Sequence, residues 1–285
     1  MVIGGAVIWA AVMAALIYAT RIRTHAHSER TASRVILWAG VAFPVTVLTV
    51  LLAYGLWMMP SVRPWSAMAE EPDLRIEVVG EQFWWRVTYH RPGEEPVVSA
   101  NEIRLPAGER VVFSLTSADV IHSFWIPALG GKMDMIPGRE NTLTLEATRP
   151  GVYRGPCTEF CGSSDALMAF AAVVMEPAAF DRWLAREGEP SPDAEAEGLD
   201  AFLSNGCDAC HRVAGTEAQG TVGPDLSHVG SRETLGAGIL PNEIASYVAL
   251  IESPEVVKPG IRMPSFHGLP DTEIEEIARY LKGLE

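Results

Sequence analysis

The stretch from Cys157 to Met168 reads CTEFCGSSDALM, with two thiols four residues apart and a thioether seven residues after the second thiol. About 35 residues upstream, the sequence Asp119-Val-Ile-His122 adds an imidazole. Sulfur and nitrogen ligands select copper over hard cations. The pattern therefore predicts a copper site formed by His122, Cys157, Cys161 and Met168. A disulfide between the two cysteines is the alternative, because an exported domain permits one.

The residues around this stretch, 67–186, follow the pattern of a β-sandwich. Apolar side chains alternate with polar ones in runs around Ile76, Phe113 and Leu143, and turn signals ending in glycine separate the runs. Short strands at this spacing indicate a sandwich or barrel of about 110 residues. An amphipathic helix, PAAFDRWLAR, is expected near residues 177–186 and closes the block.

Two uncharged apolar stretches precede this block, at residues 2–19 and 35–57. At about 1.5 Å per residue, each can cross about 30 Å of hydrocarbon, so residues 1–66 are expected to form a transmembrane helix hairpin. The connecting loop carries four arginines, which are Arg21, Arg23, Arg30 and Arg34. By the positive-inside rule this loop is cytoplasmic. The sequence therefore predicts a two-pass protein of a bacterial inner membrane, with its later domains on the periplasmic side.

A second cysteine motif follows the sandwich. Cys207-Asp-Ala-Cys210-His211 is the attachment pattern of haem c, in which two thiols bond the vinyl groups and the adjacent histidine is the proximal iron ligand. Downstream, Met263 in Arg-Met-Pro-Ser-Phe offers a thioether as the sixth ligand. Helical patterns lie before and after these motifs. Residues 199–285 are therefore expected to form an all-α haem domain.

Charge and composition exclude nucleic acid as a partner. The formal net charge is −14, distributed as +4 over residues 1–66, −8 over residues 67–190 and −10 over residues 191–285. An acidic body does not bind a phosphate backbone. Residues 187–198 read EGEPSPDAEAEG, without apolar periodicity, and are expected to form a flexible linker between the sandwich and the haem domain.

The whole arrangement resembles subunit II of haem-copper cytochrome c oxidases, in the caa3-like variety that carries a class I cytochrome c after the copper domain. The resemblance implies a Greek-key, cupredoxin-like sandwich with a dinuclear copper centre, CuA. On the family's motif, Cys157 and Cys161 match the bridging thiolates, and His122 and Met168 match an imidazole and a weak thioether ligand. Glu159 matches the residue whose carbonyl meets copper and whose carboxylate meets magnesium at the border with subunit I.

The implied function is electron entry into a membrane haem-copper oxidase. Electrons would pass from haem c to the copper site and on to the haem of subunit I, where oxygen is reduced. The resemblance places the oxygen-reducing centre in subunit I, so the enzyme is the complex. A cytochrome c or a bc1-like complex would be the upstream donor, and the linker would keep the haem domain close to the copper.

Three positions depart from the family. The second imidazole ligand belongs four residues after the second cysteine, where this chain has Asp165. The site is then a CuA-like pair with Asp165 as ligand, a mononuclear or altered copper site, or a copper site without electron transfer. Phe83 replaces a tryptophan that accepts electrons in many members, and Val35 replaces a carboxylate near a proton entry. A nitric oxide reductase subunit and a membrane-anchored copper and haem carrier are the alternative functions.

Overall fold

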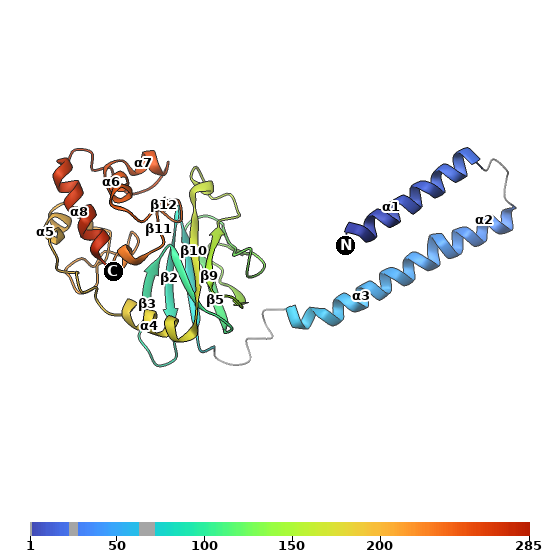
Figure 1. The fold of residues 1–285 in the computed structure, drawn as a ribbon, viewed down its shortest axis with the longest axis horizontal. Helices are drawn as coiled ribbons and strands as arrows, with labels where there is room; N and C mark the ends of the chain where they lie inside the picture. Colours follow the sequence, from blue (N-terminus) through green and yellow to red (C-terminus); the bar gives the residue numbers. More distant parts are fainter. Residues whose placement is uncertain (1, 23–27, 63–71) are drawn as a thin grey trace. The chain divides into compact units, whose positions relative to one another are not determined.

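A computed structural model describes residues 2–22, 28–62 and 72–285 of the chain (Figure 1). The chain divides into two compact units, Met1–Ser66 and Ala67–Glu285. The first unit holds the two apolar helices, and the second holds both cysteine motifs. Arg23 of the predicted cytoplasmic loop lies outside the described residues.

The first unit consists of two long helices. The elements are α1 (Val2–Ile17), the π-helical η1 (Tyr18–Ile22), α2 (Glu29–Val35), the π-helical η2 (Ile36–Ala42) and α3 (Phe43–Val62). The stretches Ile3–Ile22 and Glu29–Met59 are long and apolar enough to cross a membrane, and none of the apolar windows is buried within the unit. The wide turns of η2 end just before Pro44, which lacks the N–H that a regular helix needs. The transmembrane prediction agrees with these lengths.

The second unit begins with a five-stranded sheet in the order β3-β2-β1-β5-β8. The strands are β1 (Arg75–Glu81), β2 (Trp84–His90), β3 (Val97–Ala100), β5 (Arg110–Ser117) and β8 (Asn141–Glu146). β1 is antiparallel to β2 and parallel to β5, with Val78 opposite both Val87 and Leu115. All three of these side chains are fully buried, so the alternation in the sequence marks the face that packs on the core.

A second sheet, in the order β4-β10-β9, completes the sandwich. Its strands are β4 (Glu102–Pro106), β9 (Gly151–Pro156) and β10 (Ala169–Met175), and β6 (His122–Phe124) pairs separately with β7 (Met133–Met135). The rings of Phe124 and Phe170 stack with 5.0 Å between their centroids, and Trp85 meets both edge-on. Helix α4 (Pro177–Glu187) follows β10 and buries Phe180, Trp183 and Leu184. The expected sandwich and the expected helix are both present.

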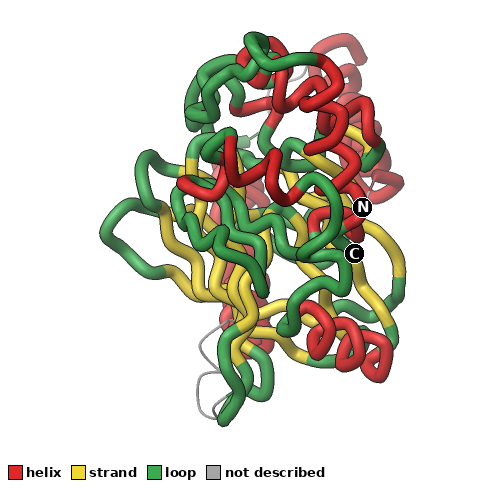
Figure 2. The backbone as a smooth tube through the Cα atoms, turned by 90° about the vertical axis from the view of Figure 1, so that its left-hand side faces the viewer, coloured by secondary structure: helices red, strands yellow, loops and turns green. Residues whose placement is uncertain are grey.

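The rest of the second unit consists mainly of short helices joined by loops. Its elements are α5 (Leu199–Ser204), the 3-10 turns η5 (Cys207–Ala209) and η6 (Val229–Ser231), β11 (Thr234–Leu235), β12 (Leu240–Pro241), α6 (Ile244–Glu252), α7 (Pro254–Val257) and α8 (Asp271–Gly283). Figure 2 shows long loops between these helices. Helix α8 buries Ile274, Ile277 and Leu281 against α5 and α6. The domain is helical as expected, with the two-residue strands β11 and β12 as an addition.

Residues 187–198, expected from their composition to form a flexible linker, pack against the helical domain in this structure. Ser191 and Ala194 are only 3% and 4% exposed. The Tyr280 hydroxyl on α8 donates to the Ala194 carbonyl at 2.7 Å, and the Ser191 hydroxyl donates to the Glu285 carbonyl at 3.2 Å. The segment packs because its small side chains and carbonyls meet partners on α8 and at the last residue, which the composition of the segment does not reveal.

Candidate metal centres

The four predicted copper ligands come from three segments of the sandwich. His122 opens β6, Cys157 and Cys161 lie in the loop after β9, and Met168 directly precedes β10. β9 and β10 pair with Pro156 opposite Ala169, and the Cys157 N–H donates to the Met168 carbonyl at 2.9 Å. The strand pairing therefore places Cys157 next to Met168. All four side chains are at most 9% exposed.

The donor atoms of these residues converge. Ligand atoms of His122, Cys157 and Cys161 lie within 4.8 Å of one another. The His122 Nδ1 lies 4.0 Å from the Cys157 Sγ, and the Cys161 Sγ lies 3.8 Å from the Met168 Sδ. Both cysteines are free thiols in this structure, so both are available to a metal. Two thiols, an imidazole and a thioether in one buried cluster fit copper.

Asp119 orients the histidine of this cluster. Its Oδ1 lies 2.8 Å from the His122 Nε2, which leaves Nδ1 directed at Cys157. Burial alone would raise the pKa of Asp119, but hydrogen bonds from His122 and from the backbone N–H groups of Gln82 and Val120 hold that pKa below its usual value. A carboxylate behind a ligating histidine fixes the ring and raises its basicity.

The two thiols of the cluster interact strongly. A hydrogen bond from Cys161 lowers the pKa of Cys157, and the same contact raises the pKa of Cys161. One thiol of the pair therefore ionises readily. This suits metal binding, because the thiolate is the form that coordinates a metal.

Two further predicted residues lie at the edge of the cluster. The backbone carbonyl of Glu159 lies 3.4 Å from the Cys157 Sγ. The Asp165 Oδ1 lies 3.4 Å from the Cys161 Sγ, at the start of the 3-10 turn η4 (Asp165–Leu167). Asp165 is thus on the Cys161 side, whereas His122 is on the Cys157 side. The carboxylate stands where it can ligate a metal that Cys161 holds.

The haem-attachment motif forms a compact turn. Cys207 opens η5, and the N–H groups of Cys210 and His211 both donate to the Cys207 carbonyl, at 3.2 and 3.0 Å. The His211 Nδ1 lies 2.8 Å from the Pro224 carbonyl and donates to it, which leaves Nε2 free. Burial lowers the pKa of His211, so the ring is neutral at pH 7. A neutral imidazole with a free Nε2 is the form that binds iron.

The pocket beside His211 fits a haem group. Cys207, Cys210, His211 and Met263 all line it, together with apolar side chains that include Phe202, Leu250, Ile251, Phe266 and Leu281. Gly223 also lines it, and a Cβ there would lie 2.6 Å from the His211 ring. Arg232 also lines the pocket and is 7% exposed. Its Nη2 donates to the Asp225 carbonyl at 2.6 Å, while its Nε has no hydrogen-bond partner in the described part of the chain. A buried cation with one unpaired N–H in the pocket lining suits a carboxylate of haem.

The sandwich supplies one wall of this haem pocket. Phe83, in the turn between β1 and β2, and Trp84, the first residue of β2, line the pocket together with residues of the cytochrome domain. Lys258, which is 2% exposed, donates from Nζ to the carbonyls of Phe83 and Gly236, at 2.7 Å each. Burial lowers the pKa of Lys258 to about 7, against the opposing field of Cys161. The two metal-binding domains are therefore joined at the haem pocket itself.

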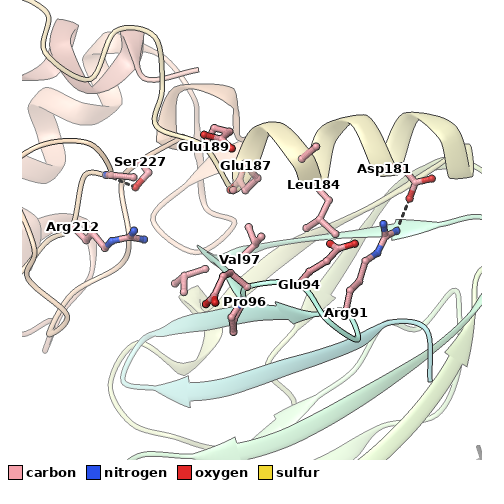
Figure 3. Close-up of a pocket in the computed structure, with 15 residues that line it drawn as sticks. Arg91, Glu94, Pro96, Val97, Asp181, Leu184, Glu187, Glu189, Arg212 and Ser227 are labelled. Atoms are coloured by element: carbon pink, nitrogen blue, oxygen red, sulfur yellow. Dashed lines mark hydrogen bonds and ion pairs between the residues drawn. The ribbon is translucent and has the colours of Figure 1, made fainter. Parts of the chain in front are cut away.

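A second cavity of about 350 Å³ lies between α4, the connection from β2 to β3 and the helical domain (Figure 3). Four of its charged side chains have partners within the protein, namely Arg91, Asp181, Glu187 and Arg212. Arg91 donates to Asp181 at 2.5 Å, as the dashed line in Figure 3 shows, and Glu187 accepts from the Ser99 hydroxyl at 2.8 Å. We assign this cavity no ligand.

Comparison with known proteins identifies the family. Residues 95–176 match the family model of the periplasmic domain of cytochrome c oxidase subunit II, and residues 195–285 match the cytochrome c family model. The chain is 36% identical over 245 residues to cytochrome c oxidase subunit 2 of Alkalihalophilus pseudofirmus strain OF4, covering 85% of this chain and 70% of that protein. The chain belongs to the cytochrome c oxidase subunit 2 family. The family predicted from the sequence is confirmed.

Two further similar proteins are a second subunit 2 and a solved periplasmic domain. Cytochrome c oxidase subunit 2 of Bacillus sp. strain PS3 is 34% identical over 224 residues, covering 74% of this chain and 62% of that protein. The crystal structure of the periplasmic domain of cytochrome oxidase subunit II of Bradyrhizobium japonicum is 33% identical and covers 42% of this chain and 96% of that one, with a TM-score of 0.39. Members of the cytochrome c oxidase subunit 2 family are electron-transfer subunits of haem-copper oxidases. The two matched domains imply a copper site and haem c.

Sequence reasoning gave no role to Asp119, Lys258 or Arg262. The spacing of Asp119, three residues before His122, was a usable signal, because the pair falls in one short loop. Lys258 carries no comparable signal, since its partners Phe83 and Gly236 are distant in sequence.

Proposed function

We propose that this chain accepts electrons in its cytochrome domain, passes them to the copper cluster of the sandwich and delivers them to an oxygen-reducing partner subunit. The observation that carries the proposal is the shared haem pocket, in which Phe83 of the sandwich lines the same cavity as His211 and Met263. Bound haem c and copper supply the reversible one-electron chemistry. Oxygen is the favoured final acceptor because the relatives over most of the chain are cytochrome c oxidase subunits.

In the cytochrome domain, the thiols of Cys207 and Cys210 would attach the haem and His211 would bind its iron through Nε2. Met263 would supply a thioether ligand to the same iron. The carbonyl of Pro224 holds the His211 ring in the tautomer that leaves Nε2 unprotonated. The apolar side chains of the pocket would surround the haem.

In the sandwich, His122, Cys157, Cys161 and Met168 would hold copper, with the Glu159 carbonyl close by. Asp119 keeps the His122 ring in place, and the buried cluster keeps solvent from the metal. For Asp165 we favour a CuA-like pair in which its carboxylate ligates the copper on the Cys161 side, since that is where the carboxylate lies.

The remaining assignments concern the partners. The two apolar helices support membrane anchoring, and the match to a periplasmic domain supports an extracytoplasmic position for residues after the hairpin. We propose a two-pass topology in a bacterial inner membrane and packing against subunit I of a haem-copper oxidase. The Glu159 carboxylate would hold magnesium at that border. A cytochrome c or a bc1-like complex would donate electrons to the haem domain.

The test is the metal and haem content of the purified full chain. Haem should stay with the protein after denaturation and acidic acetone extraction, because thioether bonds are covalent. Copper should be present in the unmodified chain. A double variant that combines Cys157→Ser with Cys161→Ser should lose the copper and keep its haem. Haem that passes into the acetone would refute the haem assignment, and copper retained by the double variant would refute the copper assignment.

A further inference from the structure

The segment of the cytochrome domain that leads into Met263 runs along the copper loop of the sandwich. This segment, residues 258–263, reads Lys-Pro-Gly-Ile-Arg-Met. The hydroxyls of Ser163 and Ser164 both donate to the Pro259 carbonyl, at 2.9 and 2.6 Å. These serines lie between Cys161 and Asp165 in the chain. The segment that carries the predicted haem ligand and the loop that carries the predicted copper ligands are thus joined by hydrogen bonds from two serine hydroxyls to one backbone carbonyl.

Lys258 makes the deepest contact of this segment. Its Nζ bridges the Phe83 carbonyl in the sandwich and the Gly236 carbonyl in the cytochrome domain. The neighbouring Gln82 side chain donates to the Cys161 carbonyl at 2.5 Å. The buried Nζ of Lys258 is therefore linked to the backbone of Cys161, a predicted copper ligand, through Phe83 and its neighbour Gln82.

The backbone at Gly260 shows how closely the two surfaces fit. Its φ of +79° favours glycine, and an added Cβ would lie 2.4 Å from the Ser163 hydroxyl. On the other side of the cluster, the Ala169 N–H, directly after Met168, donates to the Ala237 carbonyl at 2.8 Å. Contact of this kind needs one relative position of the two domains, because shifting either domain breaks buried hydrogen bonds.

An ion pair at the rim completes the contact. The Arg262 guanidinium lies 3.6 Å from the Asp119 Oδ2, and the Asp119 Oδ1 bonds His122. Arg262 is 68% exposed in its side chain, so the pair adds little stability. The pair nevertheless places Arg262, which precedes Met263 in the chain, next to the Asp119 carboxylate that orients His122.

We propose that Lys258 is the positioning residue that holds the cytochrome domain on the copper domain in one fixed arrangement, and that electrons cross between the two centres in that arrangement. The proposal rests on the proposed function. One electron passes from the reduced haem of the cytochrome domain to the oxidised copper centre, so the iron is oxidised as the copper centre is reduced, and no bond is made or broken. A tethered domain that swings on a flexible linker is the competing arrangement.

The two arrangements differ in how transfer depends on solvent viscosity. The experiment uses the full chain loaded with haem and copper. A photoreductant reduces the haem, and absorbance changes of the haem and the copper give the rate of electron transfer at increasing glycerol concentrations. A fixed arrangement gives a rate that glycerol leaves unchanged, because no domain has to diffuse. A rate in the unmodified chain that falls in proportion to viscosity would overturn the proposal without any variant.

Lys258→Met removes the ammonium while keeping an unbranched side chain of similar length. We expect transfer to slow by about ten-fold, since small displacements of reacting groups have effects of this size or more, and to become viscosity-dependent. Lys282→Met is the matched control, because the Lys282 ammonium donates to the Gly230 carbonyl inside the cytochrome domain. The control should keep a viscosity-independent rate.

The haem and copper contents and the two reduction potentials of each variant are measured first. A chain without copper or covalent haem contradicts the proposed function itself. A chain with both centres in which Lys258→Met transfers electrons as fast as the unmodified protein contradicts only the role of Lys258. If Lys258→Met does not fold, the viscosity series on the unmodified chain still tests the fixed arrangement, and Lys258→Gln, which keeps an N–H donor, tests the role of Lys258.

Discussion

Asp165 is the residue at which family resemblance and local chemistry disagree. The family places an imidazole there, and this chain places a carboxylate with its Oδ1 3.4 Å from the Cys161 Sγ. A carboxylate is a harder, anionic ligand that favours Cu(II) over Cu(I). The two copper positions would then differ, with His122 on one side and Asp165 on the other.

Replacing Asp165 by histidine should raise the reduction potential of the copper site. The negative charge that stabilises the oxidised metal is removed, and two imidazoles make the two positions alike, so the unpaired electron should be shared between them. Paired metal analysis and electron paramagnetic resonance of the two proteins check this. If the native chain already holds two coppers with a delocalised signal and Asp165→His changes nothing, Asp165 is not a ligand.

Met263 allows a second test at the scale of one residue. It lines the haem pocket with His211, and its side chain is partly buried. Met263→Ala should remove the low-spin spectrum of an axial thioether while the haem stays attached through Cys207 and Cys210. Visible and near-infrared spectra of the purified variant provide the measurement. An unchanged spectrum would assign the axial position to another side chain.

At the scale of elements, β1 makes room for the predicted copper site because Gly80 has no side chain. A Cβ on Gly80 in β1 would lie 2.8 Å from the Cδ2 of His122 in β6. The two strands are distant in sequence, yet the His122 ring rests on the backbone of β1. The strand that shapes the haem-facing turn at Phe83 therefore also holds a predicted copper ligand in place.

Gly80→Ala should weaken copper binding by about 10–100-fold, because the new methyl group displaces the His122 ring from the cluster. The overpacking should also lower the free energy of unfolding by about 1–3 kcal/mol. Copper titration and thermal unfolding measure the two effects. Gly131→Ala is the control, since a Cβ there meets open space, and it should bind copper normally. Normal copper affinity in Gly80→Ala would contradict this role of β1.

At the scale of the whole molecule, the apolar helices and the arginines between them predict the side of the membrane on which the domains lie. Arg21, Arg30 and Arg34 flank the connection between the two spans, and basic loops stay in the cytoplasm. A reporter that is active only outside the cytoplasm should therefore be active when fused after Glu285. The same reporter inserted after Ile22 should be inactive. The opposite pattern would refute the two-pass topology.

Periodicity and local motifs were sufficient to predict the sandwich, the helical domain and the candidate site residues. Alternation around Ile76 and Phe113 predicted β1 and β5, because one face of each strand packs on the core whatever the rest of the fold is. The cysteine spacings predicted which thiols could hold metal together, because Cys157 and Cys161 share one loop and Cys207 and Cys210 share one turn. Both signals are local, so one sequence was enough.

Only the tertiary structure decided how the two metal-binding domains meet. The composition of residues 187–198 predicted a flexible coil, but Ala194 is buried under Tyr280 in α8. Nothing near Lys258 in the sequence indicates that its ammonium will bond the Phe83 carbonyl, 175 residues away. A backbone carbonyl is offered by every residue alike, so its partner depends on which surfaces pack together. The sequence by itself thus determined the candidate ligands of each centre, and the packing of one domain on the other determined how the two candidate centres are joined.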